Sequence, residues 1–224
     1  MRQGIPVSAS EAEERAQFTL AMRAKGVDDL GLLRALERAP RALFVPQRFA
    51  DISLRDVALP IGCGQTSPPP STLAAMIGAL RLEPSDEVCE IGTGTGYCTA
   101  LLAQLAGRVV SLERFQTLAL EAAARITAFG LANVAVVWTD GFEFHAQGRR
   151  FDKVIAQGII EPPAREFLDL LVPGGALVAA FAGSGRGEQR IVRLTFGDRG
   201  PVHVAEFGPA RGLRPLQRGV SRAL

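Results

Sequence analysis

The sequence predicts an α/β fold built on one doubly wound, mostly parallel sheet, with an N-terminal helical cap and a C-terminal antiparallel hairpin. From residue 87 onward, short apolar runs alternate with helix-like runs, which is typical of repeated strand–helix units. A glycine-rich turn joins the first of these strands to its helix. The last two strand-like runs have no helix between them, so we expect them to pair antiparallel at one edge.

The first 82 residues predict helices and loops. Ser10-Glu11-Ala12-Glu13 has the form of a capping box, and Asp29 can cap a second helix that ends before Pro40. The consecutive prolines Pro68–Pro70 cannot stand inside a helix, and they lead to a third helix expected to begin at Ser71. The expected helices of this part span residues 10–24, 30–39 and 71–80.

The rest of the chain predicts the sheet and its connections. The expected strands are 87–91, 108–112, 134–138, 152–156, 176–181, 190–196 and 202–207. The expected helices are 97–106, 115–129 and 163–171. Turns are expected at Val172–Gly175 and at Gly197–Gly200, where proline and glycine gather.

Composition bounds the class of protein. The chain has 224 residues, 47% hydrophobic and 21% charged, with a net charge of +2, which is an ordinary globular mix. No run approaches the roughly 20 apolar residues that span a bilayer, so we expect no membrane partner. Cys63, Cys89 and Cys98 have neither metal-ligand nor disulfide spacing, so we expect no metal and a cytoplasmic protein.

The C-terminal stretch carries arginines at positions 211, 214, 218 and 222. A solvated tail is favoured over a patch that binds an anionic partner, and no nucleic acid is expected. The oligomeric state stays open.

The most informative segment is Glu90-Ile91-Gly92-Thr93-Gly94-Thr95-Gly96-Tyr97, between the first expected strand and its helix. Glycines at alternate positions, Gly92, Gly94 and Gly96, let the backbone approach a ligand closely. Glu113 ends the next strand about 20 residues later, where an acid in such folds accepts hydrogen bonds from ribose hydroxyls. Together these features predict a nucleoside cofactor.

The spacing favours one cofactor. A dinucleotide fingerprint reads G-x-G-x-x-G, but Tyr97 stands where its third glycine belongs. The helix also lacks the Lys-Ser or Lys-Thr pair of a P-loop. An acid two residues before the first glycine, Glu90, is typical of S-adenosylmethionine-dependent methyltransferases, where it can meet the cofactor's ammonium group. The alternatives are a glycine turn without a ligand and, more distantly, a nicotinamide oxidoreductase.

The other candidate residues follow from the order of the strands, because ligands bind beyond the carboxyl ends of a parallel sheet. Thr93 and the glycines should hold the amino-acid part of the cofactor. After the third strand, Asp140 can accept from the adenine amine and Gly141 allows close approach, although an ordinary Asp-Gly turn is the alternative. After the fourth strand, Gln157 should face the reacting methyl group.

Methyl transfer needs positioning more than acid–base chemistry. A carboxylate acceptor is ionised at neutral pH and needs no strong base. No histidine stands in these loops, and His145 and His203 are interpreted as structural. The sequence therefore favours an acidic acceptor over an alcohol or amine.

Over nearly its whole length the chain resembles the protein-L-isoaspartate O-methyltransferases. The similar segments are Arg41–Pro46 (R-x-x-F-V-P), Leu59–Thr66 (L-P-I-G-x-G-Q-T), Glu90–Tyr97, Ser111–Arg114, Asp140–Gly141, Phe151–Ile155 and Leu171–Gly175. The G-Q-T loop is the specific element. The resemblance implies a single methyltransferase domain, 1–224, with cap and substrate loop in 1–82 and a cofactor-binding core in 83–224. It also implies S-adenosylmethionine as cofactor and isoaspartyl residues of damaged proteins as the substrate that is methylated for repair.

Three segments depart from the family pattern. After G-Q-T the family reads I-S-x-P, but here Pro68 occupies the serine position. The catalytic candidates are therefore Ser67, if the prolines turn its side chain inward, and Thr66. Ala156–Pro162 replaces the family's small residues, and its Glu161 would repel an anionic acceptor unless it faces solvent. Gly212–Leu216 only loosely matches the family ending F-V-P-L.

These departures keep two alternatives open. One is a methyltransferase of the same family that acts on another carboxylate or a small molecule. The other is a catalytically weak module that binds S-adenosylmethionine.

Overall fold

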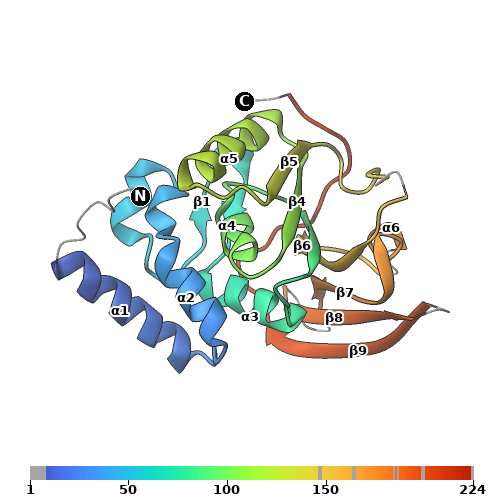
Figure 1. The fold of residues 1–224 in the computed structure, drawn as a ribbon, viewed down its shortest axis with the longest axis horizontal. Helices are drawn as coiled ribbons and strands as arrows, with labels where there is room; N and C mark the ends of the chain where they lie inside the picture. Colours follow the sequence, from blue (N-terminus) through green and yellow to red (C-terminus); the bar gives the residue numbers. More distant parts are fainter. Residues whose placement is uncertain are drawn as a thin grey trace.

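The protein is built around a seven-stranded sheet in the order β5-β4-β3-β6-β7-β8-β9. The structure is a computed structural model, and it describes residues 9–145, 148–162, 165–183, 185, 187–197 and 200–222. The strands from β5 to β7 run parallel, whereas β7–β8 and β8–β9 pair antiparallel. The predicted fold class, including the C-terminal hairpin, is confirmed (Figure 1).

The strands of this sheet are β3 (Glu87–Ile91), β4 (Arg108–Glu113), β5 (Val134–Trp138), β6 (Phe151–Ile159), β7 (Leu171–Ala182), β8 (Gln189–Gly197) and β9 (Gly200–Pro209). The helices are α1 (Ala9–Ala24), α2 (Leu30–Arg38), α3 (Pro70–Leu80), α4 (Tyr97–Ala103), α5 (Gln116–Phe129) and α6 (Arg165–Leu168). Short 3-10 helices span Arg41–Leu43, Gln47–Ile52 and Gly62–Gly64.

Alternate residues of the central strands enter two separate cores, as the two-residue period of a strand requires. On one face, Val88 and Ile155 pack with side chains from α2, α3 and α4. On the other face, Cys89 and Val154 pack with α6 and with Phe142, which lies in the loop after β5. Burial on both faces explains why these strands read as almost continuously apolar.

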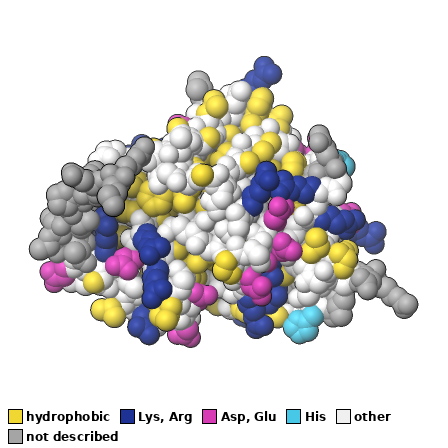
Figure 2. Space-filling model, in the orientation of Figure 1, with side chains coloured by type: hydrophobic (Ala, Val, Ile, Leu, Met, Phe, Trp, Pro, Cys, Tyr) yellow, Lys and Arg dark blue, Asp and Glu magenta, His cyan; other side chains and the backbone are white. Residues whose placement is uncertain are grey.

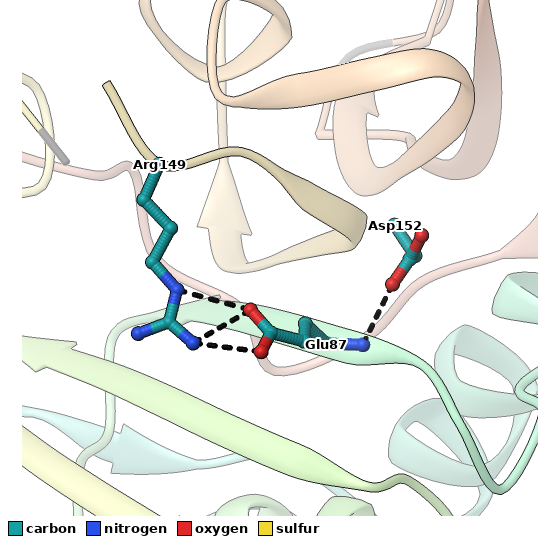
Figure 3. Close-up of polar contacts among 3 residues, drawn as sticks. All are labelled: Glu87, Arg149 and Asp152. Atoms are coloured by element: carbon teal, nitrogen blue, oxygen red, sulfur yellow. Dashed lines mark hydrogen bonds and ion pairs between the residues drawn. The ribbon is translucent and has the colours of Figure 1, made fainter.

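Polar contacts join β3 to the start of β6 at the amino ends of the strands (Figure 3). The guanidinium of Arg149 forms a two-pronged ion pair with the carboxylate of Glu87, with nitrogen–oxygen distances of 2.6–3.0 Å. The backbone N–H of Glu87 donates to Asp152 at 2.8 Å. These contacts fix the neighbouring strands at the edge opposite their carboxyl ends.

The helical cap forms as the sequence predicts, with local differences. Asp29 caps α2 by accepting from the N–H of Leu32 at 2.9 Å. Helix α1 begins at Ala9, one residue before the expected capping box, and α3 begins at Pro70 rather than Ser71. Proline suits that first helical position because its missing N–H would have no helical partner.

Three expectations about local structure were wrong. Helix α4 ends at Ala103 instead of residue 106, and of the helix expected at 163–171 only Arg165–Leu168 is helical among the described residues. Strand β7 already begins at Leu171, with the expected turn appearing as a shift of register against β6. The loop around Gly62–Gly64 closes a small hairpin of β1 (Leu59–Pro60) and β2 (Thr66–Ser67).

The C-terminal residues 210–222, here called the strap, cross the carboxyl ends of the strands instead of forming a solvated tail. In Figure 1 this red segment runs from the β8–β9 edge past β6 toward α5. The N–H of Ile159 donates to Arg214 at 2.9 Å, and the N–H of Gln116 donates to Ser221 at 2.9 Å. The interpretation as a solvated tail is therefore corrected, although its arginine side chains are exposed.

Charged side chains of both signs are interspersed on the surface. Figure 2 shows Lys and Arg side chains next to Asp and Glu side chains on the face viewed in Figure 1. Ion pairs of this kind include Lys25–Asp56 at 3.0 Å and Arg125–Glu121 at 2.9 Å. Such partly exposed surface pairs each contribute about 1 kcal/mol or less.

Candidate active site

A cavity of about 220 Å³ opens at the carboxyl ends of β3, β4 and β6. Its walls come from the glycine-rich turn, the ends of these strands, the hairpin that precedes α3, and the strap. The predicted site residues that line it are Thr66, Ser67, Gly92, Thr93, Gly94, Glu113, Asp140, Gly141 and Gln157. The structure thus brings together residues that are up to 91 positions apart in the sequence, from Thr66 to Gln157.

The glycine-rich turn is held against β4. Gly92, Gly94 and Gly96 have φ angles of +95°, +56° and +88°, the left-handed region that favours glycine. The N–H groups of Gly92 and Thr93 both donate to the carbonyl of Leu112, at 2.8 and 3.2 Å. These backbone hydrogen bonds, made within the chain itself, hold the turn in place. Gly96 packs against α5 behind the turn instead of lining the cavity.

Glu113 lies at the end of β4 with its carboxylate buried in the cavity wall. One oxygen accepts from the N–H of Gly94 at 2.8 Å and the other from the N–H of Phe115 at 3.0 Å. Burial raises the pKa of this carboxyl, and the two backbone hydrogen bonds oppose that rise. Each oxygen keeps a further lone pair, so the fixed carboxylate can still accept from a ligand.

Glu90 does not line the cavity, contrary to the expectation that it meets the cofactor directly. Its carboxylate is fully buried beneath the turn, where it accepts from Thr99 at 2.5 Å and from Ser111 at 2.6 Å. Burial raises its pKa to about 7, opposed by these hydrogen bonds. Ser111 also bonds the hydroxyl of Thr93 at 2.5 Å, so Glu90 anchors the turn from below.

Asp140 and Gly141 occupy the expected loop after β5. The carboxylate of Asp140 accepts from the N–H of Phe142 at 2.9 Å and from the N–H of Gly219 in the strap. A side chain at position 141 would place its Cβ only 2.6 Å from Ile91. Glycine is therefore required here because the backbone at position 141 lies close to β3. Asp140 is thus both an Asp-Gly turn residue and part of the cavity wall.

Gln157 faces the cavity beside the turn. Its Nε2 lies 2.8 Å from the sulfur of Cys98. Its Oε1 is buried and has no hydrogen-bond partner among the described residues. A buried carbonyl oxygen without a partner is costly, so this atom is available for a donor that enters the cavity.

The hairpin before α3 presents Thr66 and Ser67. Thr66 donates its hydroxyl to the carbonyl of Gly212 in the strap at 3.0 Å. Ser67 is 6% exposed, lines the cavity, and accepts from the guanidinium of Arg41 at 3.2 Å. The side chain is therefore turned inward, and its hydroxyl hydrogen is left to donate elsewhere. Pro68 lines the same cavity.

Arg41 organises this region from the core. It is 1% exposed, and its guanidinium donates to the carbonyls of Ser53 and Val57 at 3.2 Å and of Pro68 at 2.9 Å. Burial lowers its pKa to about 10, so it stays cationic at neutral pH. In the sequence, Arg41 stands out only as the first residue of R-x-x-F-V-P. That motif is the sequence signal for its role.

The remaining ionisable candidates lie outside the cavity. Glu161 is exposed and absent from the cavity wall, so it places no negative charge on that wall. His145 and His203 are also exposed and outside this wall. The cavity wall thus carries no histidine within the described residues.

Comparison with known proteins agrees with this arrangement. The sequence model of the family described as protein-L-isoaspartate(D-aspartate) O-methyltransferase (PCMT) matches residues 13–207. The chain belongs to this family. Membership confirms the predicted enzyme class, an S-adenosylmethionine-dependent methyltransferase, and its cofactor.

Individual PCMT relatives match most of the chain. It is 41% identical over 207 residues to protein-L-isoaspartate O-methyltransferase 2 of Rhodopseudomonas palustris (strain HaA2), covering 91% of this chain and 95% of the relative. It is 44% identical over 209 residues to the protein-L-isoaspartate O-methyltransferase of Maricaulis maris (strain MCS10), covering 93% and 96%. A solved Plasmodium falciparum structure, described as a beta-aspartate methyltransferase in complex with S-adenosyl-L-homocysteine, is 16% identical with a TM-score of 0.76. It covers 91% of this chain and 98% of that one, which confirms the fold.

Several site features of this PCMT chain were missed by sequence reasoning. Thr99 and Ser111 hold Glu90, and neither carries a local signal for that contact. Arg114 donates to the carbonyl of Gly219 at 2.7 Å and so joins β4 to the strap. These contacts connect distant segments, so only the folded chain reveals them.

Proposed function

We propose that this chain transfers a methyl group from S-adenosylmethionine to the free carboxylate of isoaspartyl residues in damaged proteins, as a step of protein repair. The observation that carries the proposal is a single cavity walled by both Glu113 and Ser67. Glu113 offers a fixed carboxylate suited to ribose hydroxyls, and Ser67 offers a buried hydroxyl beside the G-Q-T loop. A cofactor and an acceptor can therefore meet in it.

The residues present fit the cofactor. Glu113 suits the ribose, and the partnerless Oε1 of Gln157 suits an ammonium or other donor. Gly92 and Gly94 line the cavity without side chains, so a ligand can approach their backbone closely. Asp140 is placed to accept from an adenine amine once it shares or gives up its bond to Gly219. When bound, S-adenosylmethionine supplies an electrophilic methyl group.

The acceptor side needs positioning rather than a base. A carboxylate acceptor has already lost its proton at neutral pH, which agrees with a described cavity wall that has no histidine. We propose that Ser67 donates to one acceptor oxygen while Arg41 holds its hydroxyl in place. Thr66 acts as a positioning residue, because its hydroxyl joins this loop to the strap.

The first experiment is transfer of a labelled methyl group from S-adenosylmethionine to an isoaspartyl peptide and to its aspartyl twin. We expect methylation of the isoaspartyl peptide only. Methylation of neither peptide, with cofactor binding confirmed by calorimetry, would favour another acceptor or a module that only binds the cofactor.

The role of Ser67 is tested with Ser67→Ala and a matched serine outside the cavity. We expect Ser67→Ala to lower kcat/KM about tenfold or more at unchanged cofactor affinity, since a hydrogen bond to a charged group is worth roughly 1.5–3 kcal/mol. Ser71→Ala is the control, because its hydroxyl bonds Asp56 at the start of α3. Equal activity of both variants would refute the role given to Ser67.

Location and organisation belong to the same proposal. Within the described residues no helix is long and apolar enough to cross a membrane. Cys89 and Cys98 are buried thiols outside any disulfide, which supports the proposal of a reducing cytoplasm. We also propose that residues 1–82 and 83–224 act as one domain, since α2 and α3 share a core with β3 and β6.

A further inference from the structure

A cation stands on the cavity wall where the acceptor is expected to bind. Arg214 of the strap lines the cavity together with Ser67, Pro68 and Gln157. Its side chain is exposed, so the guanidinium keeps access to solvent and to an entering peptide. Arginine is always charged at physiological pH and matches the planar geometry of a carboxylate.

The backbone fixes the position of Arg214. Its carbonyl accepts from the N–H of Ile159 at 2.9 Å, and Pro215 pairs with Ile159 in an isolated β-bridge. A Cβ at position 158 would lie 2.8 Å from the carbonyl oxygen of Arg214, so only Gly158 permits this approach. Arg214 is therefore built into the end of β6 and is not part of a free tail.

The strap also touches the loop that carries Ser67. Thr66 donates to the carbonyl of Gly212 at 3.0 Å. A Cβ at Gly212 would lie 2.7 Å from Ala58 and 2.9 Å from Pro69. Arg214 thus lies between the hairpin that presents Ser67 and the end of β6 that presents Gln157.

The other charged groups of the cavity are already engaged. Glu113 and Asp140 accept from backbone N–H groups, and Arg114 donates to strap carbonyls, including that of Gly219. Within the described part of the chain, the guanidinium of Arg214 has neither an ion-pair nor a hydrogen-bond partner. It is therefore the cation of this wall that is available to an anionic ligand.

We infer that Arg214 binds the acceptor carboxylate and determines the preference of this chain for a charged acceptor, an inference that rests on the proposed function. Pro68 has neither a hydroxyl nor an N–H to offer an acceptor, and Arg214 lines the same cavity. The guanidinium supplies the donor that Pro68 lacks. Methylation neutralises the carboxylate, so the same contact favours substrate over the ester product and assists product release.

The test compares Arg214→Ala, Arg214→Lys and the control Arg211→Ala, which removes an exposed strap arginine outside the cavity wall. The substrate is an isoaspartyl peptide, and the competitor is the same peptide with an isoasparaginyl carboxamide. We expect Arg214→Ala to raise KM for the isoaspartyl peptide about tenfold, with a smaller change in kcat. Arg214→Lys should show a smaller rise in KM, because it keeps the charge but not the planar fork. Cofactor affinity, measured by calorimetry, should stay unchanged.

The neutral competitor distinguishes charge recognition from a structural effect. The unaltered protein should bind the carboxamide peptide about tenfold more weakly than the isoaspartyl peptide, and Arg214→Ala should lose this preference. If Arg214→Ala and Arg211→Ala share the same KM and the same preference, the role of Arg214 is refuted while the proposed function stands. If the unaltered protein methylates no isoaspartyl peptide, the proposed function fails and the role of Arg214 fails with it.

Discussion

The guanidinium of Arg41 donates to the hydroxyl of Ser67 at 3.2 Å and, in the same region, to the carbonyl of Pro68 at 2.9 Å. A fully buried cation thus sets the direction of the Ser67 hydroxyl, on a residue that lines the cavity. Since the donors of an arginine form a fixed fork, the loop can take few other conformations without leaving carbonyls unpaired.

Arg41→Ala should therefore weaken both stability and catalysis. Several buried carbonyls lose their donor, and we expect the free energy of unfolding to fall by roughly 2–4 kcal/mol, as unpaired buried acceptors cost. Chemical denaturation measures this fall, with Arg34→Ala on the exposed face of α2 as the control. Arg41→Lys should recover only part of the stability. A loss no larger than that of the control would contradict the role of Arg41.

Glu113→Ala should weaken binding of S-adenosylmethionine by roughly 1–3 kcal/mol, the usual cost of a lost charged hydrogen bond. Part of the loss arises because the N–H groups of Gly94 and Phe115 lose their acceptor. Calorimetric titration with the cofactor checks the effect. Glu121→Ala, which removes an exposed carboxylate paired with Arg125, should leave the affinity unchanged. Equal affinities of the two variants would refute the assignment.

Gly94→Val should abolish measurable cofactor binding. Gly94 has a φ of +56°, and a Cβ there would enter the cavity wall 3.4 Å from Ile61. The matched control is Gly26→Val, because Gly26 has a φ of +89° and nothing lies within 4 Å of its missing Cβ. Both variants should lose stability through backbone strain, but only Gly94→Val should lose the cofactor. Retained binding in Gly94→Val would contradict the proposed cofactor site.

Glu90 should make stability depend on pH. Burial raises its pKa from 4.5 to about 7, so its contribution to stability is full below pH 4.5 and is lost as pH rises through 7. The unaltered protein should lose this contribution as pH rises, whereas Glu90→Gln has no such group to titrate. The difference in the free energy of unfolding between Glu90→Gln and the unaltered protein should therefore increase by roughly 3 kcal/mol from pH 5 to pH 9. Denaturation at several pH values measures this, with exposed Glu161→Gln as control. Parallel curves for Glu90→Gln and the unaltered protein would show that Glu90 does not titrate in this range.

Local patterns predicted much of the molecule because the forces behind them are local. Strand β3, the turn at Gly92 and the Asp29 cap each follow from neighbouring residues. The position of Glu113 at the end of β4 follows from the strand–helix period alone. Short helices were predicted less well: α6 has few residues, and its ends depend on packing against β7.

The chain by itself determined the fold class, the cofactor turn and the family, because glycine spacing and strand period are properties of consecutive residues. Only the tertiary structure decided that Glu90 lies beneath the turn, that Arg41 holds Ser67, and that the strap brings Arg214 to the cavity. Each of these depends on contacts between segments far apart in the sequence. Such contacts are selected by burial and hydrogen-bond satisfaction of the whole chain, and no local pattern encodes them.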